Sequence, residues 1–325
     1  MDLAPHMLPP YPVVRLSPKA EARAIRHGFP WVYAGELVMD RRTSSLRPGA
    51  LAVLEDAERR PLGVVTVNPG SRIVARVLDQ DPGAVVGRDW IAGRLRRALA
   101  LRERLHEAPF YRLVHAEADG LPGVVVDRMG EVAVLQPNAA WAEAMLGPLV
   151  AALAEVAGVA SVVKSAGSRG RALEGLDAET VMALGPAPEG PIEVPMNGAT
   201  YLADVLGGQK TGLFFDQRPN HAFAASVARG ARVLDVFAHV GGFGLAALAG
   251  GAASATLVDS SAAALALARG GAARMGREVE ARQGDAFAVM EALGAEGRRF
   301  DLVVCDPPAF APHKGALEAG LRAYE

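Results

Sequence analysis

The chain has 325 residues, and its 34 Lys and Arg side chains nearly balance 36 Asp and Glu, which gives a net charge of −2. With 50% apolar and 22% charged residues, the composition is that of a globular protein and excludes a disordered or fibrous chain. At about 150 residues per domain, this length predicts two domains or three small ones. The balanced charge excludes a uniformly basic nucleic-acid binder but not a local basic surface, because binding depends on how charge is distributed.

The cysteine and histidine content argues against disulfides and metals. The single cysteine, Cys305, excludes a disulfide framework and a cysteine-based zinc site. Neither His115 nor His239 has a partner at metal-ligand spacing, so we expect no metal.

Nothing in the sequence indicates export or a membrane segment. The N-terminus lacks a basic segment followed by an apolar run, as a signal peptide would have. The uncharged stretch 236–258 is long enough to span a bilayer, but its five glycines favour two buried elements joined by turns. We therefore expect a cytoplasmic protein with no membrane partner.

Residues 1–84 are predicted to form a small β-barrel. One helix is expected around Ala20–His27, and turn signals such as Asn68-Pro69-Gly70 separate the β-rich runs. These runs lie at 13–16, 52–55, 63–67 and 73–78. Short strands at this spacing are typical of a small barrel.

A basic helix is expected next. From Arg88 to Arg112 the chain has seven arginines and three acids, with apolar residues recurring every three to four positions. Arg94 and Arg97 on its basic face are candidates for contact with RNA phosphates. Trp31 in the preceding domain is a candidate for stacking on a base, although such faces are more often solvated and such aromatics more often core.

Residues 85–190, which include this helix, are interpreted as a small α+β domain. A hairpin of strands 123–127 and 131–136 is followed by a helix from about 140 to 156 and a strand at Ser161–Lys164. Proline and glycine then crowd residues 186–195, as in a linker or an entry loop.

Residues 191–325 alternate between strands and helices. Strands are expected at 232–237, 254–259, 279–283 and 300–306, with helices at 243–249, 262–275 and 286–293 between them. This order predicts a doubly wound parallel sheet, and the apolar fourth strand is expected to be buried on both faces. The predicted fold class is therefore α/β with several domains.

Candidate ligand-binding residues follow each strand of this sheet, at the edge where α/β proteins bind ligands. After the first strand, Gly241, Gly242 and Gly244 would let a ligand approach the backbone and the next helix N-terminus. Asp259 ends the second strand, where a carboxylate can accept both hydroxyls of a ribose. Asp285 can accept a hydrogen bond from an adenine amine.

Two cofactors fit this layout. Residues 242–247 match the dinucleotide pattern G-x-G-x-x-A, but that motif needs its first glycine directly after the strand, and here five residues separate Asp235 from Gly241. The ordered series of Asp235 with the glycines, Asp259, Asp285 and Asp306-Pro307-Pro308 favours S-adenosylmethionine (SAM) over NAD.

The chain also resembles a family, the bacterial class I SAM-dependent 23S rRNA (cytosine-C5) methyltransferases. Four sequence words carry the resemblance: Gly28-Phe29-Pro30-Trp31-Val32-Tyr33, Asn68-Pro69-Gly70-Ser71, residues 117–127 (EADGLPGVVVD) and residues 211–220 (TGLFFDQRPN). The resemblance covers the whole chain and implies an N-terminal PUA domain, a central α+β domain and a Rossmann-like methyltransferase domain. It implies large-subunit rRNA as substrate, SAM as methyl donor, and Asp216, Gln217 and Arg218 closing the cofactor pocket. The expected cofactor contacts are Asp216, Gln217, Arg218, Asp235, Phe237, Gly241, Gly242, Asp259, Asp285 and Asp306.

The C5 reaction raises the question of a nucleophile. Cytosine C5 transfer normally needs a thiolate that first adds to C6. Asp306, Pro307 and Pro308 are expected at the reacting base, but Ala309 stands where related enzymes can have a cysteine. The resemblance places the attacking cysteine beyond residue 325, so the chain reads as C-terminally truncated, with an incomplete sheet. Cys305, within the apolar run 302–305, is the less favoured alternative.

Other functions remain open at this stage. The chain could be an RNA-binding, catalytically incomplete fragment of such an enzyme, or a SAM enzyme that methylates another RNA atom. An NAD enzyme is a more distant alternative, and a homodimer is possible.

Overall fold

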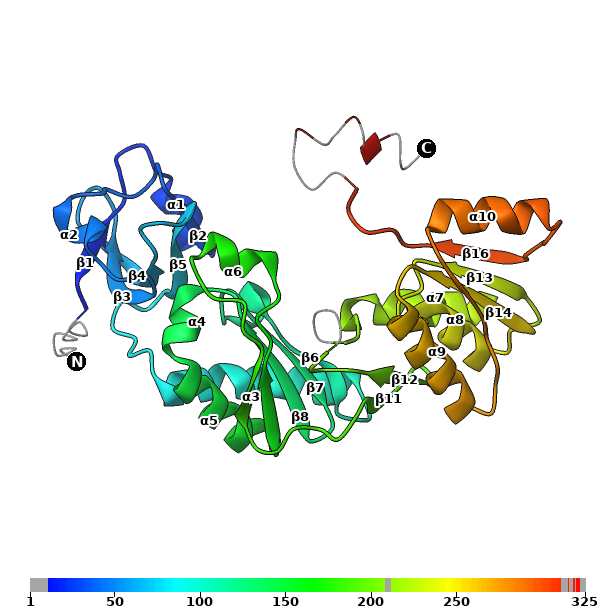
Figure 1. The fold of residues 1–325 in the computed structure, drawn as a ribbon. Helices are drawn as coiled ribbons and strands as arrows, with labels where there is room; N and C mark the ends of the chain where they lie inside the picture. The colour runs from blue at the N-terminus through cyan, green and yellow to red at the C-terminus, as the bar shows by residue number, and fades with distance from the viewer. Residues whose placement is uncertain (1–10, 208–211, 311–314, 316–317, 319, 322–325) are drawn as a thin grey trace. The chain divides into compact units, whose positions relative to one another are not determined.

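The computed structural model describes residues 11–207, 212–310, 315, 318, 320 and 321, and every structural statement below refers to these residues. The chain forms two compact units, Met1–Ala187 and Pro188–Glu325. Figure 1 shows the first unit in blue to green and the second in green to red.

The N-terminal part of the first unit is a five-stranded sheet in the order β1-β3-β4-β5-β2. Its strands are β1 (Val13–Arg15), β2 (Trp31–Tyr33), β3 (Ala50–Glu55), β4 (Pro61–Val67) and β5 (Ile73–Asp79), with short helices α1 (Ala22–Arg26) and α2 (Arg41–Ser44). The four predicted strands and the predicted helix are present. The sequence analysis missed β2, a three-residue strand that pairs antiparallel with β5.

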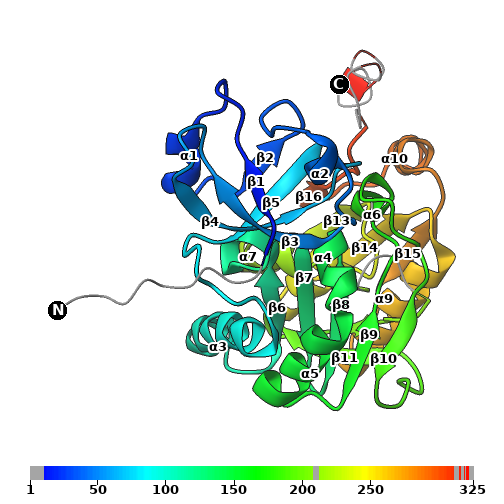
Figure 2. The same ribbon diagram turned by 90° about the vertical axis from the view of Figure 1, so that its left-hand side faces the viewer.

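The rest of the first unit is a second five-stranded sheet, in the order β10-β9-β8-β7-β6. Its strands are β6 (Phe110–His115), β7 (Val124–Met129), β8 (Val132–Pro137), β9 (Ser161–Lys164) and β10 (Val181–Leu184). Its helices are α3 (Arg88–Leu105), α4 (Ala140–Ala144), α5 (Leu146–Ala157) and α6 (Arg169–Leu173), with the 3₁₀ turn η1 (Ala116–Asp119). Helices α3 and α5 lie side by side against this sheet and bury Ile91, Leu95, Leu149 and Leu153 in one apolar core (Figure 2).

Two helices of this region differ from the sequence expectation. The basic helix ends at Leu105, because Pro109 and the β-forming run after it produce β6 instead. The helix expected from 140 to 156 is divided between α4 and α5 at Met145. Pro148 has no N–H for a hydrogen bond to Ala144, and a proline is tolerated only in the first turn of a helix, so a new helix begins there.

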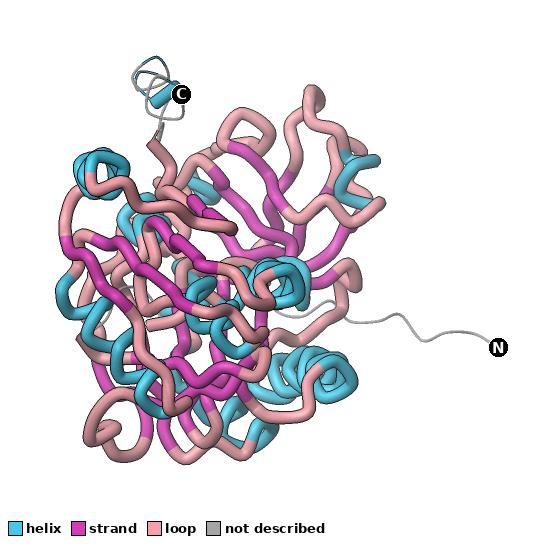
Figure 3. Tube along the Cα trace, turned by 90° about the vertical axis from the view of Figure 1, so that its right-hand side faces the viewer, coloured by secondary structure: helices cyan, strands magenta, loops and turns pink. Residues whose placement is uncertain are grey.

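The second unit contains a parallel sheet in the order β15-β14-β13-β16. Its strands are β13 (Arg232–Val236), β14 (Ser254–Asp259), β15 (Glu280–Gln283) and β16 (Leu302–Cys305). Helices α8 (Gly242–Ala249) and α9 (Ala262–Arg274) pack on one face and α10 (Ala286–Ala295) on the other, as Figure 3 shows with helices in cyan and strands in magenta. The predicted doubly wound α/β fold is confirmed.

Two further elements of this unit were not predicted. A hairpin of β11 (Ile192–Met196) and β12 (Ala199–Ala203) packs against α8 and α9. The 3₁₀ turn η2 (Phe215–Gln217) leads into α7 (Arg218–Val227), which packs against α8. The stretch 236–258 holds the end of β13, then α8, then most of β14, and no described helix has the length and apolar character to cross a bilayer.

Strand β16 corrects one expectation. We predicted it to be buried on both faces, but among the described residues it pairs with β13 alone and lies at the edge of the sheet. Its side chains are therefore partly open to solvent: Val303 is 54% exposed and Cys305 is exposed.

Candidate functional site

A sharply turned backbone follows β13 and leads directly into α8. Phe237, His239 and Gly241 all have positive φ angles, of 64°, 49° and 81°. Left-handed backbone is costly for residues other than glycine, and such strain concentrates at ligand sites. A side chain on Gly244 would place its Cβ 2.3 Å from Leu257 Cδ2, so α8 lies tight against β14. The turn thus brings the backbone N–H groups of the α8 N-terminus to the carboxyl edge of the sheet.

Asp235 holds this turn from beneath. It is fully buried near the end of β13, and its Oδ2 accepts a hydrogen bond of 2.8 Å from the Gly244 N–H. Burial raises the pKa of Asp235 to about 7 although the N–H groups of Gly244 and Phe243 lower it, and the charges of Asp306 and Asp259 raise it further. Asp235 is therefore a support for the glycine turn.

Asp259 ties the tip of the turn to the neighbouring strand. At the end of β14, its Oδ2 accepts from the His239 N–H and its Oδ1 from the Ser261 N–H, both at 2.8 Å. A carboxylate has about four acceptor positions, so two bonds leave capacity for the hydroxyls of a ribose.

Asp285 follows β15 and forms the N-cap of α10. Its Oδ1 accepts from the N–H groups of Phe287 and Ala288, both at 3.1 Å. Both of these bonds use one carboxylate oxygen, and the side chain is exposed at the same edge of the sheet as Asp259.

The segment before α7 reaches the end of β16. Gln217 Nε2 donates to Asp306 Oδ2 at 3.0 Å, and Asn220 Nδ2 donates to Gln217 Oε1 at 2.6 Å. Burial raises the pKa of Asp306, and the nearby charge of Asp216 adds to the rise. Asp216 and Gln217 therefore meet Asp306, which is far from them in the sequence.

Sequence reasoning missed a group of ring side chains behind the turn. His221 of α7 is buried, stacks on Tyr201 of β12 with ring centroids 6.1 Å apart, and meets Phe243 edge-on at 4.6 Å. Tyr201 Oη donates to the Gly242 carbonyl at 3.0 Å, and burial lowers the pKa of His221 to about 4, so its ring is neutral. No local pattern indicated Tyr201 and His221, because β12 and α7 lie outside the strand–helix alternation.

A second group of rings lies over the edge of the sheet, and it joins the predicted Phe237 to two rings that the sequence analysis did not assign to the site. Phe310 has its ring centroid 6.0 Å from the rings of both Phe237 and Phe287. These three rings connect the segments after β13, β15 and β16. They give the acidic edge an apolar wall of the kind on which a purine can stack.

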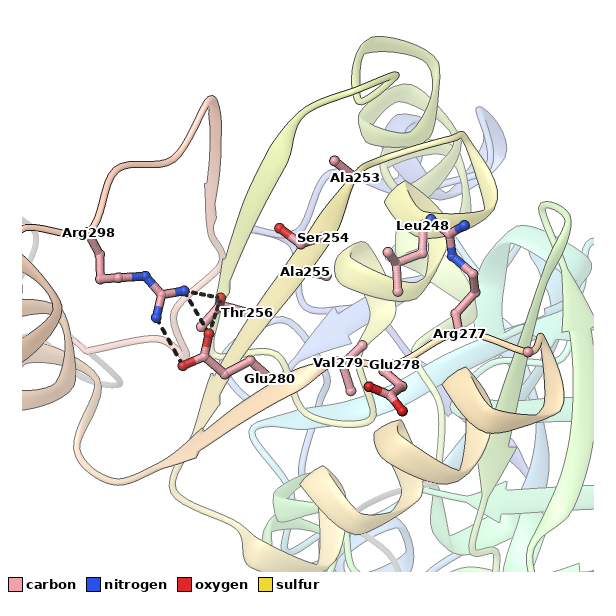
Figure 4. A pocket seen from close by; sticks show the side chains of 11 residues that line it. Leu248, Ala253, Ser254, Ala255, Thr256, Arg277, Glu278, Val279, Glu280 and Arg298 are labelled. Atoms are coloured by element: carbon pink, nitrogen blue, oxygen red, sulfur yellow. Dashed lines mark hydrogen bonds and ion pairs between the residues drawn. The ribbon is translucent and has the colours of Figure 1, made fainter.

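A hollow of this unit lies at the other end of the strands. It has a volume of about 520 Å³ and includes Ser254, Arg277 and Glu280, at the amino ends of β14 and β15 (Figure 4). Arg298 Nη2 pairs with Glu280 Oε2 at 2.7 Å, and this partner lowers the pKa of Glu280 to about 2. We interpret this cluster as an ion-pair network of the fold, separate from the carboxyl edge.

The RNA-binding candidates in the first unit have different surroundings. Trp31 donates its indole N–H to Glu117 Oε1 at 2.8 Å, and Arg94 pairs with Asp79 Oδ2 at 2.7 Å while lying over the Trp90 ring. Arg97 is exposed on α3. Beside Trp31, Phe29 and Tyr33 are about 40% exposed.

A hollow of about 240 Å³ opens beside these aromatic residues. Its lining includes Phe29, Trp31 and Tyr33, together with Ala24 of α1. Phe29 and Trp31 meet edge-on with ring centroids 6.1 Å apart.

The fold and the site together define the class of protein. A glycine turn after the first strand, with carboxylates after four parallel strands, is the arrangement of a SAM-dependent methyltransferase. The family of S-adenosylmethionine-dependent methyltransferases matches residues 158–322, and a PUA-like domain matches residues 14–80.

Comparison with known proteins then gives the particular family. The chain is 35% identical over 318 residues to ribosomal RNA large subunit methyltransferase I of Shewanella amazonensis, covering 96% of this chain and 80% of the relative. The protein of the same name from Erwinia tasmaniensis is 32% identical over 316 residues, covering 94% and 78%. This chain belongs to the ribosomal RNA large subunit methyltransferase I family, and SAM is its cofactor.

Solved structures show the same fold. A candidate SAM-dependent methyltransferase from Streptococcus mutans superposes with a TM-score of 0.77 at 18% identity, covering 96% of this chain and 82% of that one. A second methyltransferase structure, SMU.776 in complex with SAH, gives a TM-score of 0.76 at 19% identity, covering 93% and 77%.

Proposed function

We propose that this enzyme transfers the methyl group of SAM to large-subunit ribosomal RNA, at C5 of a cytosine. The observation that carries the proposal is the set of carboxylates at the ends of β13 to β16 in a chain with ribosomal RNA methyltransferases as relatives. The C5 position comes from the resemblance in the sequence words.

Each residue of the carboxyl edge has a proposed role in holding SAM. Asp259 accepts the ribose hydroxyls, Asp285 accepts from the adenine amine, and the glycine turn at Gly241 and Gly242 admits the cofactor close to the backbone. When bound, SAM supplies an electrophilic methyl group. Gln217, already bonded to Asp306, closes the pocket together with Asp216 and Arg218.

Asp306, Pro307 and Pro308 are proposed to face the reacting base. The two prolines restrict the backbone after β16, which fixes the position of Asp306. Cys305 is not the nucleophile in this proposal: partial desolvation raises the pKa of its thiol, and the charge of Asp306 raises it further, so the reactive thiolate is disfavoured.

RNA contact is proposed for the PUA-like domain, within a division of the chain into residues 1–84, 85–190 and 191–325. Residues 11–80 contain eleven Lys and Arg but only seven Asp and Glu, whereas the whole chain is slightly acidic. Phe29 and Tyr33 are the exposed rings beside Trp31, and they are suited to stack on an unpaired base. Arg97 is suited to a phosphate. A cytoplasmic location and a homodimer stay predictions.

The test is transfer of isotope-labelled methyl groups from SAM to rRNA of cells that lack the protein, followed by mass spectrometry of the nucleosides. Labelled 5-methylcytosine supports the proposal. Label in another nucleoside would overturn C5 and support the alternative, a different RNA atom. RNA binding without any label would instead support an incomplete, RNA-binding role.

Cys305 can be tested in the same assay with Cys305→Ser. Unchanged label relative to the parent chain is expected. Loss of label with SAM binding intact would identify Cys305 as the nucleophile.

A further inference from the structure

Glu174, which follows α6 in the first unit, is almost completely buried although it is charged. Its side chain is 4% exposed. Its side-chain donors all belong to the PUA-like domain: Ser71 Oγ and Arg76 Nη2 donate to Oε1 at 2.9 and 2.8 Å, and Asn68 Nδ2 donates to Oε2 at 3.0 Å. Within the α+β domain, the Ala140 N–H also donates to Oε2, at 3.4 Å. A buried carboxylate of the α+β domain thus depends on donors from the other domain.

Arg76 extends this contact to a second carboxylate. The guanidinium lies on β5, is 13% exposed, and also approaches Glu117 Oε1 at 3.5 Å. Glu117 in turn accepts the indole N–H of Trp31 at 2.8 Å. Arg76 therefore lies between two glutamates of the α+β domain, and Trp31 adds a further bond from β2.

For a third carboxylate the domains are exchanged: the acceptor belongs to the PUA-like domain and its donors belong to the α+β domain. Asp79 at the end of β5 accepts from Trp90 Nε1 at 2.8 Å and from Arg94 Nη2 at 2.7 Å, both on α3. We call Glu174, Glu117 and Asp79 with their bonded partners the carboxylate clamp. Trp31 and Arg94, which the sequence analysis named as candidates for contact with RNA, belong to this clamp.

The clamp uses residues from three of the sequence words that carry the family resemblance. Trp31 lies in the word Gly28-Phe29-Pro30-Trp31-Val32-Tyr33. Asn68 and Ser71 come from the word Asn68-Pro69-Gly70-Ser71, and Glu117 begins the word at 117–127. Burial would raise the pKa of Glu174, but the hydrogen bonds from Asn68 and Arg76 outweigh it, so this pKa lies below its usual value and the group is charged at neutral pH.

We infer that the carboxylate clamp fixes the PUA-like domain to the α+β domain as one body, and that Glu174 is a positioning residue for the RNA substrate. Separation of the two domains would take from Glu174 all three of its side-chain donors and from Arg76 both of its glutamates, which opposes hinge motion between the domains. The pocket beside Phe29 and Tyr33 would then be presented at a fixed distance from α3. The positioning role rests on the proposed RNA function, whereas the rigidity does not.

Rigidity is tested by a distance distribution between spin labels on the full chain. Labels at Ala57→Cys, in the turn between β3 and β4, and Glu103→Cys, on exposed α3, are placed in a Cys305→Ser background, measured by pulsed electron resonance. Glu174→Gln keeps the size of the side chain but removes its charge. It also places an amide N–H group where the partners are themselves hydrogen-bond donors. We expect one narrow distance for the parent and a broadened distribution for Glu174→Gln.

Glu179→Gln is the matched control, because Glu179 is an exposed glutamate a few residues along the chain; it should keep the narrow distance. An equally narrow distribution for Glu174→Gln would overturn the clamp. If Glu174→Gln fails to fold, Ser71→Ala removes one donor and leaves the carboxylate paired with Arg76, and it should give a smaller broadening.

The positioning role is tested by separate affinities for RNA and for SAM. In Glu174→Gln, the apparent Kd for rRNA should rise at least several-fold while the Kd for SAM stays the same. A broadened distance with unchanged rRNA affinity would overturn the positioning role. Failure of the parent chain to bind rRNA would overturn the proposed function, and the distance measurement would still decide the rigidity.

Discussion

At the carboxyl edge of the parallel sheet, the turn between β13 and α8 has a backbone conformation that restricts which residues can occupy it. Gly244 is placed where even a methyl group would overlap with Leu257, and Gly241 has a positive φ angle. The carboxylates of Asp235 and Asp259 bond to backbone N–H groups of the same turn. We therefore expect the affinity for SAM to depend on these residues through the shape of the turn.

Gly244→Ala is expected to weaken SAM binding and lower the melting temperature. Its Cβ would lie 2.3 Å from Leu257 Cδ2, and overpacking of this kind costs about 1–3 kcal/mol. Gly294→Ala in α10 is the control, because nothing lies within 4 Å of its Cβ and alanine favours a helix by roughly 0.5–1 kcal/mol. Thermal melts with and without SAM measure both effects. Equal behaviour of the two variants would contradict the packing argument.

Asp235→Asn should change how stability depends on pH. The folded pKa of Asp235 is raised to about 7 from 3.8, so between these values the folded chain holds a proton that the unfolded chain has released. Stability then falls as pH rises from about 4 to 7. Asparagine can still accept from Gly244 but does not titrate. The melting temperature of the variant relative to the parent should rise between pH 5 and pH 8; a constant difference would contradict the assignment.

At the level of secondary-structure elements, the parallel sheet of the second unit is open to solvent at strand β16. Strand β16 lies at the edge of the described sheet, and Val303 is more than half exposed there. An unpaired apolar edge can pair with another chain, which favours aggregation.

Val303→Lys is therefore expected to raise the concentration at which the chain begins to aggregate. Because Val303 is exposed, the free energy of unfolding should change by no more than about 0.5 kcal/mol. Light scattering over a concentration series and a thermal melt measure these two quantities. Aggregation at the same concentration as the parent would show that the β16 edge is not responsible.

The elements also show what the sequence could predict. Apolar runs between turn signals located β13 to β16 within one or two residues, because each strand is defined by local patterning. Strands β2 and β12 were missed, because they lie outside the regular alternation of strands and helices that located β13 to β16. The edge position of β16 was also missed, because an apolar run does not reveal whether a neighbouring strand is present.

The same distinction applies to the functional site. Asp259, Asp285 and Asp306 could be predicted because the ends of parallel strands meet at one edge. The contacts of Gln217 with Asp306, and of Tyr201 and His221 with the turn, join residues from distant parts of the chain. Trp31 and Arg94 are residue types that often contact RNA, but the sequence alone does not reveal that they donate hydrogen bonds to Glu117 and Asp79.

At the level of the whole molecule, we propose different roles for the two units: the second binds SAM and the first contacts RNA. The second unit contains the proposed SAM site with every carboxylate assigned to it. The first unit contains the PUA-like sheet and the α+β domain, joined by the carboxylate clamp. This division predicts that substitutions in the clamp affect RNA and leave SAM binding unchanged, while substitutions in the glycine turn do the reverse.

The measurement that tests the account most directly is calorimetric titration of the chain and of Asp259→Ala with SAM, and with NADH for comparison. We expect SAM to bind the parent and NADH not to bind. Asp259→Ala loses the acceptor for the ribose and the bond to the turn, and hydrogen bonds to a charged group are worth about 1.5–3 kcal/mol, so SAM affinity should fall by roughly tenfold or more. Equal SAM affinity in a folded Asp259→Ala variant, or binding of NADH in preference to SAM, would contradict the assignment of the carboxyl edge as the SAM site.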